Sequence, residues 1–168
     1  YPGNLDALTG TGFCRNGPSN DNNVKAPQRE QYRLDQLDDV LSTTSSVFLG
    51  LTIGCARCHD HKSEPISQED YYRILAVFNT GEPREYLISG STQNNGRKQK
   101  GPAIRSFQDA DARARPTFVL FRGDAKARGP GVKPSVPSAL QSIPFPEPKP
   151  LAGLKTTGLR HSLARWMT

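Results

Sequence analysis

The sequence predicts a mainly α-helical, loop-rich fold with two principal helices, one short strand near 116–121 and an extended proline-rich strap after it. Apolar side chains recur at helical spacing in two segments, one ending near residue 50 and one beginning near residue 67. Hydrophobic residues make up 35% of the chain, against roughly 45–50% apolar usage (a count that includes Gly) in an average domain. Most of the 14 prolines follow residue 100. We therefore expect a modest core and much irregular structure.

The first helix is expected from about Arg29 to Leu49. Its apolar stripe has helical spacing and consists of Leu34, Leu37, Leu41, Phe48 and Leu51, widened by Val40 and Val47. Acidic and amide side chains at 35, 36, 38 and 39 point the other way. Gly50 or Gly54 ends the helix. Residues 1–28 are rich in Gly, Asn and Pro, which predicts turns and loop.

The second helix is expected to open at Ser67. The run from Ser67 to Asp70 has the S-x-x-D form of a capping box, in which two side chains satisfy the first free amides of a helix. The apolar face that follows consists of Tyr71, Ile74, Leu75 and Phe78. Gly81 lies just past the expected end of this helix.

The rest of the chain carries weaker signals. Residues 81–115 lose periodicity, which predicts mostly loop, with a short helix near 104–112 as the alternative. The run 116–121 is the one clear strand pattern. The proline density between Gly129 and Pro150 indicates an extended strap without regular structure. Leu159, Leu163 and Trp166 give the C-terminus a helical pattern.

The charge balance is basic, with a formal net charge of +6. Basic residues cluster at 97–100 and between Arg113 and Arg128. No RNP, zinc-finger or helix-turn-helix pattern accompanies them, so we expect no nucleic-acid partner and read the clusters as solvated loops or a patch for an acidic group. No run approaches the ~20 apolar residues of a transmembrane helix.

The most informative stretch is Cys55-Ala56-Arg57-Cys58-His59. A C-x-x-C-H run is typical of covalent haem attachment, in which two thiols add to the porphyrin vinyl groups and the histidine binds the iron. The sequence therefore predicts one haem c, with thioethers at Cys55 and Cys58 and His59 as the proximal iron ligand.

Zinc is the main alternative cofactor. Cys55, Cys58 and His61, with Cys14 as a fourth ligand, form a donor set that zinc accepts in structural sites. A dithiol redox pair and two unrelated buried thiols are further alternatives. A thioredoxin-like site needs a strand before the motif, whereas here a helix is expected. If haem takes Cys55 and Cys58, Cys14 is single and reads as a small buried hydrophobe or a partner for another cysteine.

The sequence does not identify the distal ligand of the iron. His61 is excluded as the ligand opposite His59, because two residues span only about 7 Å and cannot pass around a porphyrin edge. His161 and Met167 are the candidates that we name, beside lysines, further polypeptide or an open position. Near the motif, Pro65 or a neighbouring loop residue offers a carbonyl to orient the histidine. The cationic Arg57, Lys62 and Arg73 are either propionate partners or surface charges.

These predictions favour electron transfer over catalysis. The main alternative is a haem enzyme with an open sixth position, or a haem domain that serves a catalytic domain; a structural zinc module is the third hypothesis. Covalent haem attachment takes place outside the cytoplasmic membrane, so we expect a periplasmic or otherwise exported protein. Its expected partner is a redox protein or a further haem domain of the same assembly.

Three parts are expected along the chain. Residues 1–80 form the haem-binding helical segment, 81–115 a loop or linker, and 116–168 the strand, the strap and the start of a further helical domain. The chain begins at Tyr1 without an initiator Met and ends within a helical pattern. We therefore expect it to be part of a larger protein.

The segment 48–62, continuing through Pro65-Ile66 to 70–72, closely resembles the secreted cytochrome-like proteins of planctomycetes. These are large exported proteins with adjoining domains of unknown function. Further segments agree in order, namely 11–13, 15–18, 35–40, 115–120, 122–124, Val132, Pro134, 136–137 and 163–166. The resemblance implies an exported c-type cytochrome-like protein, of which this chain spans the end of one domain and the start of the next, but implies no reaction.

The chain departs from that family pattern in four places. Cys14 replaces an aliphatic residue, and Ser63-Glu64 replaces a more usual Phe-Asp. His161 stands where a small or apolar residue is expected, which weakens a family-wide role for it as a ligand. The stretch 81–115 is shorter than expected.

Overall fold

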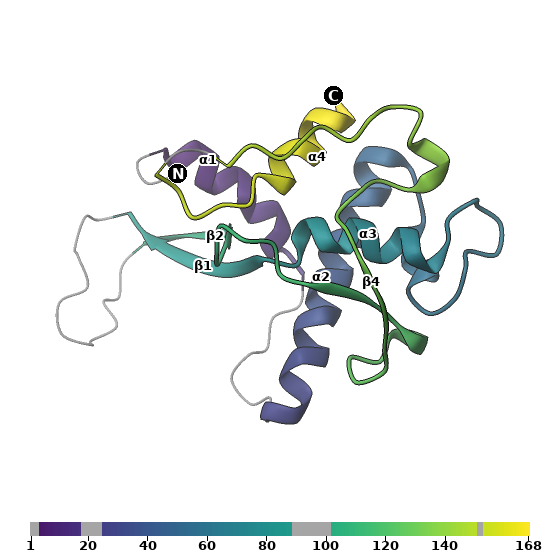
Figure 1. The fold of residues 1–168 in the computed structure, drawn as a ribbon. Coiled ribbons are helices and arrows are strands. Elements are labelled where there is room, and N and C mark those ends of the chain that lie inside the picture. Colours follow the sequence, from purple (N-terminus) through teal and green to yellow (C-terminus); the bar gives the residue numbers. More distant parts are fainter. Residues whose placement is uncertain (1–3, 18–24, 89–101, 151–152) are drawn as a thin grey trace.

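The computed structural model describes residues 4–17, 25–88, 102–150 and 153–168. Figure 1 shows helices gathered around α3, with a long hairpin extending to one side. In chain order the elements are α1 (Leu5–Gly10), η1 (Thr11–Arg15), α2 (Ala26–Leu49), η3 (Ile53–Arg57), α3 (Gln68–Phe78), β1 (Gly81–Leu87), β2 (Ala103–Asp109), β3 (Thr117–Leu120), η4 (Phe121–Gly123), β4 (Arg128–Val132), η5 (Ser138–Leu140) and α4 (Leu159–Met167).

The predicted fold class is wrong. The described part of the chain is mixed α/β, with two antiparallel two-stranded sheets beside its helices, rather than mainly α with one short strand. One sheet pairs β1 with β2, from Gly81 opposite Asp109 to Leu87 opposite Ala103. The other pairs β3 with β4 and contains an irregularity between Phe118 and Leu120.

Three local predictions fail with it. The stretch 81–115 is not mostly loop, since it contains β1 and β2, and the short helix considered near 104–112 is the strand β2. The strap expected between Gly129 and Pro150 contains most of β4 and the short helix η5. Residues 1–28 are not only turns and loop, because Asn4 accepts the amide of Ala7 (2.9 Å) and caps α1.

Both principal helices are confirmed. α2 ends at Gly50, whose φ of +65° is left-handed and suits glycine at a helix C-terminus. α3 opens with the predicted capping box, in which the Ser67 hydroxyl accepts the amide of Asp70 and the Asp70 carboxylate accepts the amide of Ser67 (both 3.1 Å). The strand predicted near 116–121 is β3, and the C-terminal helical pattern is α4.

The core is built around α3. Eight of its eleven residues are buried, so this short helix is enclosed on nearly all sides. One hydrophobic cluster joins it to side chains of α2, η3, β2, β3 and α4. The division into 1–80, 81–115 and 116–168 stays a prediction. Within the described residues, no helix is both long and apolar enough to cross a membrane.

Candidate functional site

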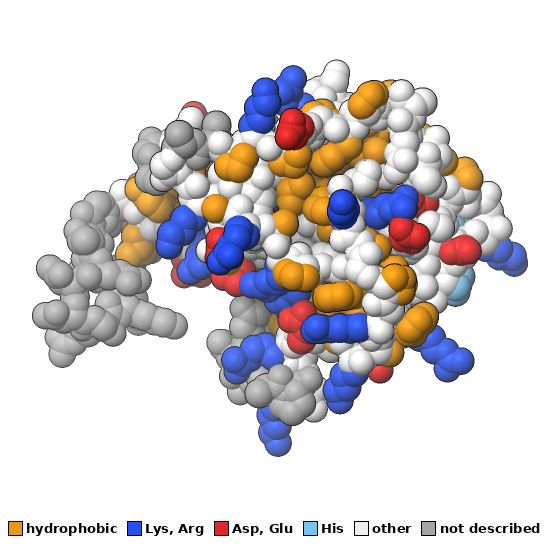
Figure 2. Space-filling model, in the orientation of Figure 1, with side chains coloured by type: hydrophobic (Ala, Val, Ile, Leu, Met, Phe, Trp, Pro, Cys, Tyr) orange, Lys and Arg blue, Asp and Glu red, His pale blue; other side chains and the backbone are white. Residues whose placement is uncertain are grey.

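The C-x-x-C-H motif lies on a single tight turn between the two principal helices. Its 3₁₀ segment η3 points Ile53 and Ala56 into the core, where both are 0% exposed. Cys55, Cys58 and His59 are exposed instead. Figure 2 shows histidine atoms at the surface on the side where the loop after α2 protrudes in Figure 1. Two apolar anchors thus hold the turn while its thiols and imidazole face outwards.

The backbone of the motif is tied to α3. The carbonyl of Arg57 accepts hydrogen bonds from the Tyr72 hydroxyl (3.1 Å) and from Nε2 of Gln68 (3.0 Å). The same two groups also donate to the carbonyl of Leu120 at the end of β3 (3.3 and 3.1 Å). Burial raises the pKa of Tyr72 to about 12, so its hydroxyl stays a donor at neutral pH. Tyr72 and Gln68 therefore join η3 to β3.

The side chain of Arg57 is tied to α2. Its guanidinium forms ion pairs with Asp35 and, at 3.2 Å, with Asp38. The Tyr71 hydroxyl donates to the other oxygen of Asp38 (2.5 Å). Burial alone would lower the pKa of Arg57, but the hydrogen bond to Asp35 and the nearby carboxylates raise it above its usual value. Arg57, considered from the sequence as a propionate partner, is therefore held by two carboxylates of α2.

The sequence did not predict that Asp35 and Asp38 would hold Arg57. It placed both residues on the polar face of the first helix, away from its apolar stripe. The signal that could have found them is their i,i+3 spacing next to a motif that carries an arginine, because residues three apart share one face of a helix.

Glycine lets a third element approach the motif. At Gly123 a Cβ atom would lie 3.4 Å from the sulfur of Cys58 and 3.1 Å from Nε of Arg57. Its φ of +73° also favours glycine. The short helix η4 thus packs directly beside Cys58.

His59 is oriented by its own loop. Its Nδ1 lies 2.7 Å from the carbonyl of Asp60, the distance of a hydrogen bond donated by the ring. The Asp60 side chain accepts the amide of Gln68 (2.8 Å), which fixes the loop to the start of α3. A neighbouring loop carbonyl therefore plays the orienting role considered for Pro65, and no hydrogen bond engages Nε2 of His59 within the described residues.

His61 serves the loop rather than a metal. Its Nδ1 accepts the amides of Ser63 (3.2 Å) and Glu64 (2.8 Å), so the ring proton sits on Nε2, which lies 3.3 Å from the Thr52 hydroxyl. That hydroxyl donates to Glu64 (3.1 Å). Because both ring nitrogens are engaged, His61 could not bind a metal without opening the loop.

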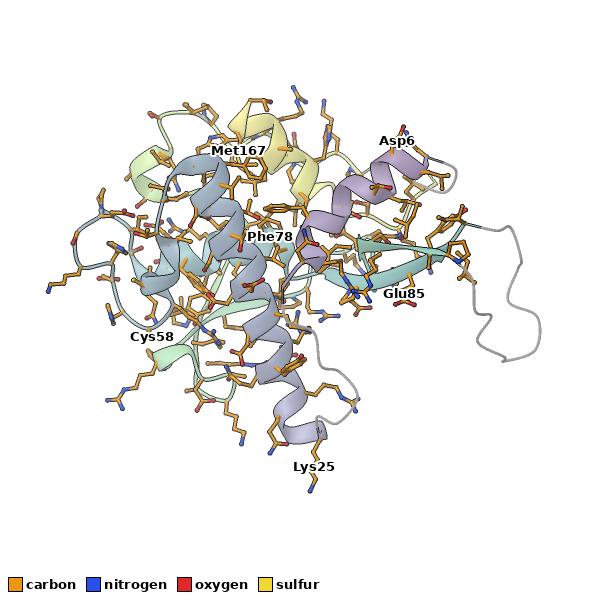
Figure 3. All side chains as sticks on the ribbon, turned by 180° about the vertical axis from the view of Figure 1, so that it is seen from behind. Asp6, Lys25, Cys58, Phe78, Glu85 and Met167 are labelled. Atoms are coloured by element: carbon orange, nitrogen blue, oxygen red, sulfur yellow. The ribbon has the colours of Figure 1, made fainter. Side chains whose placement is uncertain are left out.

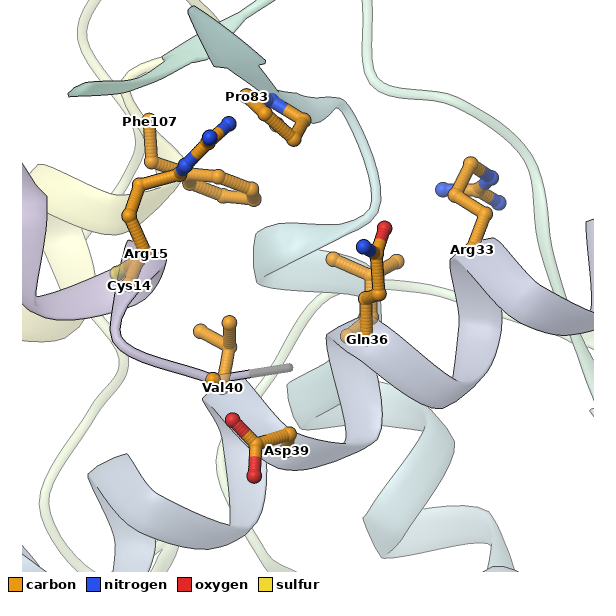
Figure 4. Close-up of a pocket in the computed structure, with 11 residues that line it drawn as sticks. Cys14, Arg15, Arg33, Gln36, Asp39, Val40, Pro83 and Phe107 are labelled. Atoms are coloured by element: carbon orange, nitrogen blue, oxygen red, sulfur yellow. The ribbon is translucent and has the colours of Figure 1, made fainter. Parts of the chain in front are cut away.

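The zinc set considered from the sequence is not assembled. The four residues all lie in the described part of the chain, in which no group of three or more His, Cys, Asp or Glu side chains could hold a metal ion. Cys14 instead lines a small cavity of about 40 Å³ between η1 and α2, beside Val40 and Phe107 (Figure 4). Burial raises the pKa of its thiol. This position agrees with the first alternative given for Cys14, that of a small hydrophobic side chain.

The two named candidates for a distal ligand are on α4. His161 is exposed, and Met167 packs against the hydrophobic core. Figure 3 shows Met167 at the end of α4, in a different part of the molecule from Cys58. His161 belongs to no group of three or more His, Cys, Asp or Glu side chains that could hold a metal ion in the described residues.

The donor set of the motif fits a covalent haem. Cys55 and Cys58 are free, exposed thiols one short turn apart, and the imidazole of His59 is oriented with Nε2 available. These are the three groups that attachment requires.

Comparison with known proteins covers the part of the chain that carries this motif. Residues 2–82 match the model of the family PSCyt2, described as a protein of unknown function (DUF1549). The matched part is a planctomycete-type domain of unknown function. No curated protein and no solved structure matches the chain. The PSCyt2 match includes α2, the motif and α3, and it ends at the second residue of β1.

Proposed function

We propose that this chain carries one covalent c-type haem and transfers electrons within a larger exported protein or assembly. Cys55 and Cys58 would form the thioethers, and His59 would be the proximal ligand. The observation that carries the proposal is that two free thiols and an oriented imidazole are exposed on one turn. Of the two residues between the thiols, Ala56 is buried and Arg57 is held by ion pairs with α2.

The residues around the motif would give the site its rigidity. A bound haem supplies reversible one-electron chemistry, whose potential depends on ligation, burial and hydrogen bonding. The carbonyl of Asp60 holds the His59 ring and increases its basicity, as outer partners of ligating histidines do. Tyr72 and Gln68 fix the backbone at Arg57, so both thiols keep one spacing. Rigid ligation of this kind suits electron transfer, because little rearrangement accompanies a change of charge.

Export follows from the proposed cofactor. Covalent haem attachment takes place outside the cytoplasmic membrane, so the protein would be periplasmic or otherwise exported. Its partner would be a redox protein or a further haem domain of the same assembly.

The test is expression of the full chain in the periplasm of a host with a c-type maturation system, followed by a pyridine haemochrome spectrum. We expect one haem per chain, with an α-band typical of two thioether bonds. Cys55→Ser and Cys58→Ser should each shift the band to that of a single thioether, and the matched control Cys14→Ser should leave it unchanged. A chain that matures without bound haem contradicts the proposal, most directly if it contains stoichiometric zinc.

The spin state separates the two haem functions. A six-coordinate low-spin spectrum in both redox states supports electron transfer. High-spin iron that binds cyanide or carbon monoxide supports the alternative, a haem enzyme with an open sixth position.

A further inference from the structure

We propose that a cavity between β2 and the start of α4 binds a small organic carboxylate, a function separate from the C-x-x-C-H motif. We name it the β2–α4 cavity. Its volume is about 490 Å³, within the range of small-molecule sites. Its lining comes from α1, η1, the β1–β2 hairpin, the segment before α4 and α4 itself, namely Leu8, Thr11, Arg84, 107–110, 153–156 and Arg160.

Elements distant in sequence form this cavity. Figure 1 shows the segment before α4 running close to α1 and beside the base of the hairpin. The amide of Phe107 donates to the Thr11 hydroxyl (3.0 Å), which fixes β2 to η1. Leu8 and Phe107 are 2% and 3% exposed and give the cavity a fixed apolar wall.

Basic side chains outnumber acidic ones in the lining. Arg84, Lys155 and Arg160 line the cavity together with one carboxylate, that of Asp109. Oδ2 of Asp109 accepts the Thr157 amide (2.7 Å) and two threonine hydroxyls, from Thr156 (3.0 Å) and Thr157 (2.8 Å). Its Oδ1 accepts Nη2 of Arg160 (3.1 Å). Because three cationic side chains line the cavity with this one carboxylate, the cavity is left with excess positive charge.

Arg160 is a cation held rigidly in the wall. Its Nη1 donates to the carbonyl of Phe107 (2.8 Å), and its guanidinium lies 5.2 Å from the centre of the Phe107 ring. Its Nε is buried and has no hydrogen-bond partner among the described residues, so it does not face the open cavity. Arg160 therefore contributes to the wall through the positive charge of its guanidinium.

The other acidic groups nearby do not cancel this charge. Glu82 pairs with Arg84 (3.2 Å) and also with Arg115 (3.1 Å), so a second cation shares its carboxylate. Asp111 is fully exposed, and the charges of both Arg113 and Lys155 act on it. Lys155 therefore stays attractive to an anion that enters the cavity.

The same features select the kind of ligand. The hydroxyls of Thr11 and Thr156 already donate to the carbonyl of Leu8 and to Asp109, so they have no proton left for a neutral polar ligand. Apart from the Gln108 amide, the lining offers an apolar wall beside an excess of positive charge. That combination favours a negatively charged head on a short apolar body.

The experiment is a calorimetric titration of the full chain at low ionic strength with benzoate and hexanoate, with benzamide as the uncharged match for benzoate. We expect both carboxylates to bind with one site per chain. Benzamide should bind at least about five-fold more weakly, the factor that one exposed ion pair supplies. Added salt should weaken carboxylate binding, because exposed charges are screened.

Paired variants locate the site. Lys155→Met should weaken benzoate binding about five-fold, and Lys133→Met, an equal change of net charge beyond β4, should leave it unchanged. Arg84→Met provides a second test at an exposed side chain if Lys155→Met does not fold. The proposal is overturned if neither carboxylate binds, if benzamide binds as well as benzoate, or if the variants at 155 and 133 behave alike. Cys55→Ser should not alter benzoate binding, so failure here leaves the haem proposal intact.

Discussion

The carboxylate of Asp70 holds Ser138, a residue 68 positions later in the chain. Asp70 is fully buried at the start of α3 and accepts both the amide and the hydroxyl of Ser138 (both 2.9 Å). The same carboxylate completes the capping box with Ser67. These hydrogen bonds outweigh burial and keep the pKa of Asp70 below its usual value. One charge thus caps a helix and fastens the proline-rich segment to it.

Asp70→Asn should lower the free energy of unfolding by about 2–3 kcal/mol, because an amide keeps one acceptor oxygen and brings a buried NH₂ that lacks an acceptor. Ser138→Ala removes only the hydroxyl and should cost about 1 kcal/mol. Urea unfolding measures both. A Ser138→Ala variant as stable as wild type would show that Asp70 does not hold the proline-rich segment through this hydroxyl.

Arg57→Met should lower the free energy of unfolding by about 2 kcal/mol, since it leaves Asp38 in a half-buried setting without its cation. The matched control is Arg84→Met, whose side chain is 54% exposed in a single ion pair with Glu82. That change should stay within about 0.5 kcal/mol. If Arg57→Met lowers the free energy of unfolding no more than its control does, the ion pairs between Arg57 and α2 do not contribute to stability.

Because the pKa of Tyr72 is raised, we expect the protein to lose stability in alkali. The unfolded phenol has a pKa of about 10, whereas burial raises the folded value to about 12. Between these values the unfolded chain loses the proton more readily, so this part of the stability is intact below about pH 10 and falls as the pH rises towards about 12. Measured from about pH 9 to about pH 11.5, Tyr72→Phe should show a flatter decline than wild type.

The matched control for that experiment is Tyr86→Phe, at an exposed position of β1. It should decline with pH as wild type does. A slope unchanged by Tyr72→Phe would mean that the phenol is not held in its neutral form.

The three thiols should differ in reactivity before haem is attached. Cys55 and Cys58 are exposed, while burial raises the pKa of Cys14 and lowers its share of reactive thiolate. Iodoacetamide at about pH 8, followed by mass spectrometry of peptides, should modify Cys14 at least about ten-fold more slowly. In the haem-loaded protein Cys55 and Cys58 should not react at all. Fast modification of Cys14 would contradict its position in the cavity of Figure 4.

Gly158 and Gly50 form a matched pair of left-handed glycines, with φ of +75° and +65°. A Cβ atom at Gly158 would lie 2.8 Å from the carbonyl oxygen of Lys149, whereas one at Gly50 would meet nothing within 4 Å. Gly50→Ala should therefore cost about 1 kcal/mol, from backbone conformation alone. Gly158→Ala should cost about 3 kcal/mol, because backbone atoms must also move. Equal losses on thermal unfolding would exclude the contact with Lys149.

Local signals in the sequence determined the two principal helices and one strand. The stop at Gly50, the capping box from Ser67 to Asp70 and the strand 116–121 each depend on a few adjacent residues. The C-x-x-C-H spacing likewise predicted which side chains share one turn. Whether they hold haem stays a prediction, although their exposure agrees with it.

Only the tertiary structure decided the sheets and the surroundings of the motif. Most residues of β1 are exposed, and the strand shows no alternation of apolar and polar residues. Proline density, which includes Pro130, argued against a strand, but in a two-stranded sheet every strand is an edge, and a missing amide can face outwards. Pro83 lies in β1, also an edge strand. Pro130 also falls at the irregular register of β4.

The same limit applies to the contacts that fix the site. Arg57 has its partners on α2, and Tyr72 joins the motif to Leu120, which lies 48 residues after Tyr72 in the chain. Strand pairing and such contacts depend on which distant segments meet when the core is buried, and no short stretch of sequence encodes that choice. The sequence determined the reactive groups of this protein, and the packing of α2, α3 and β3 decided how they are held.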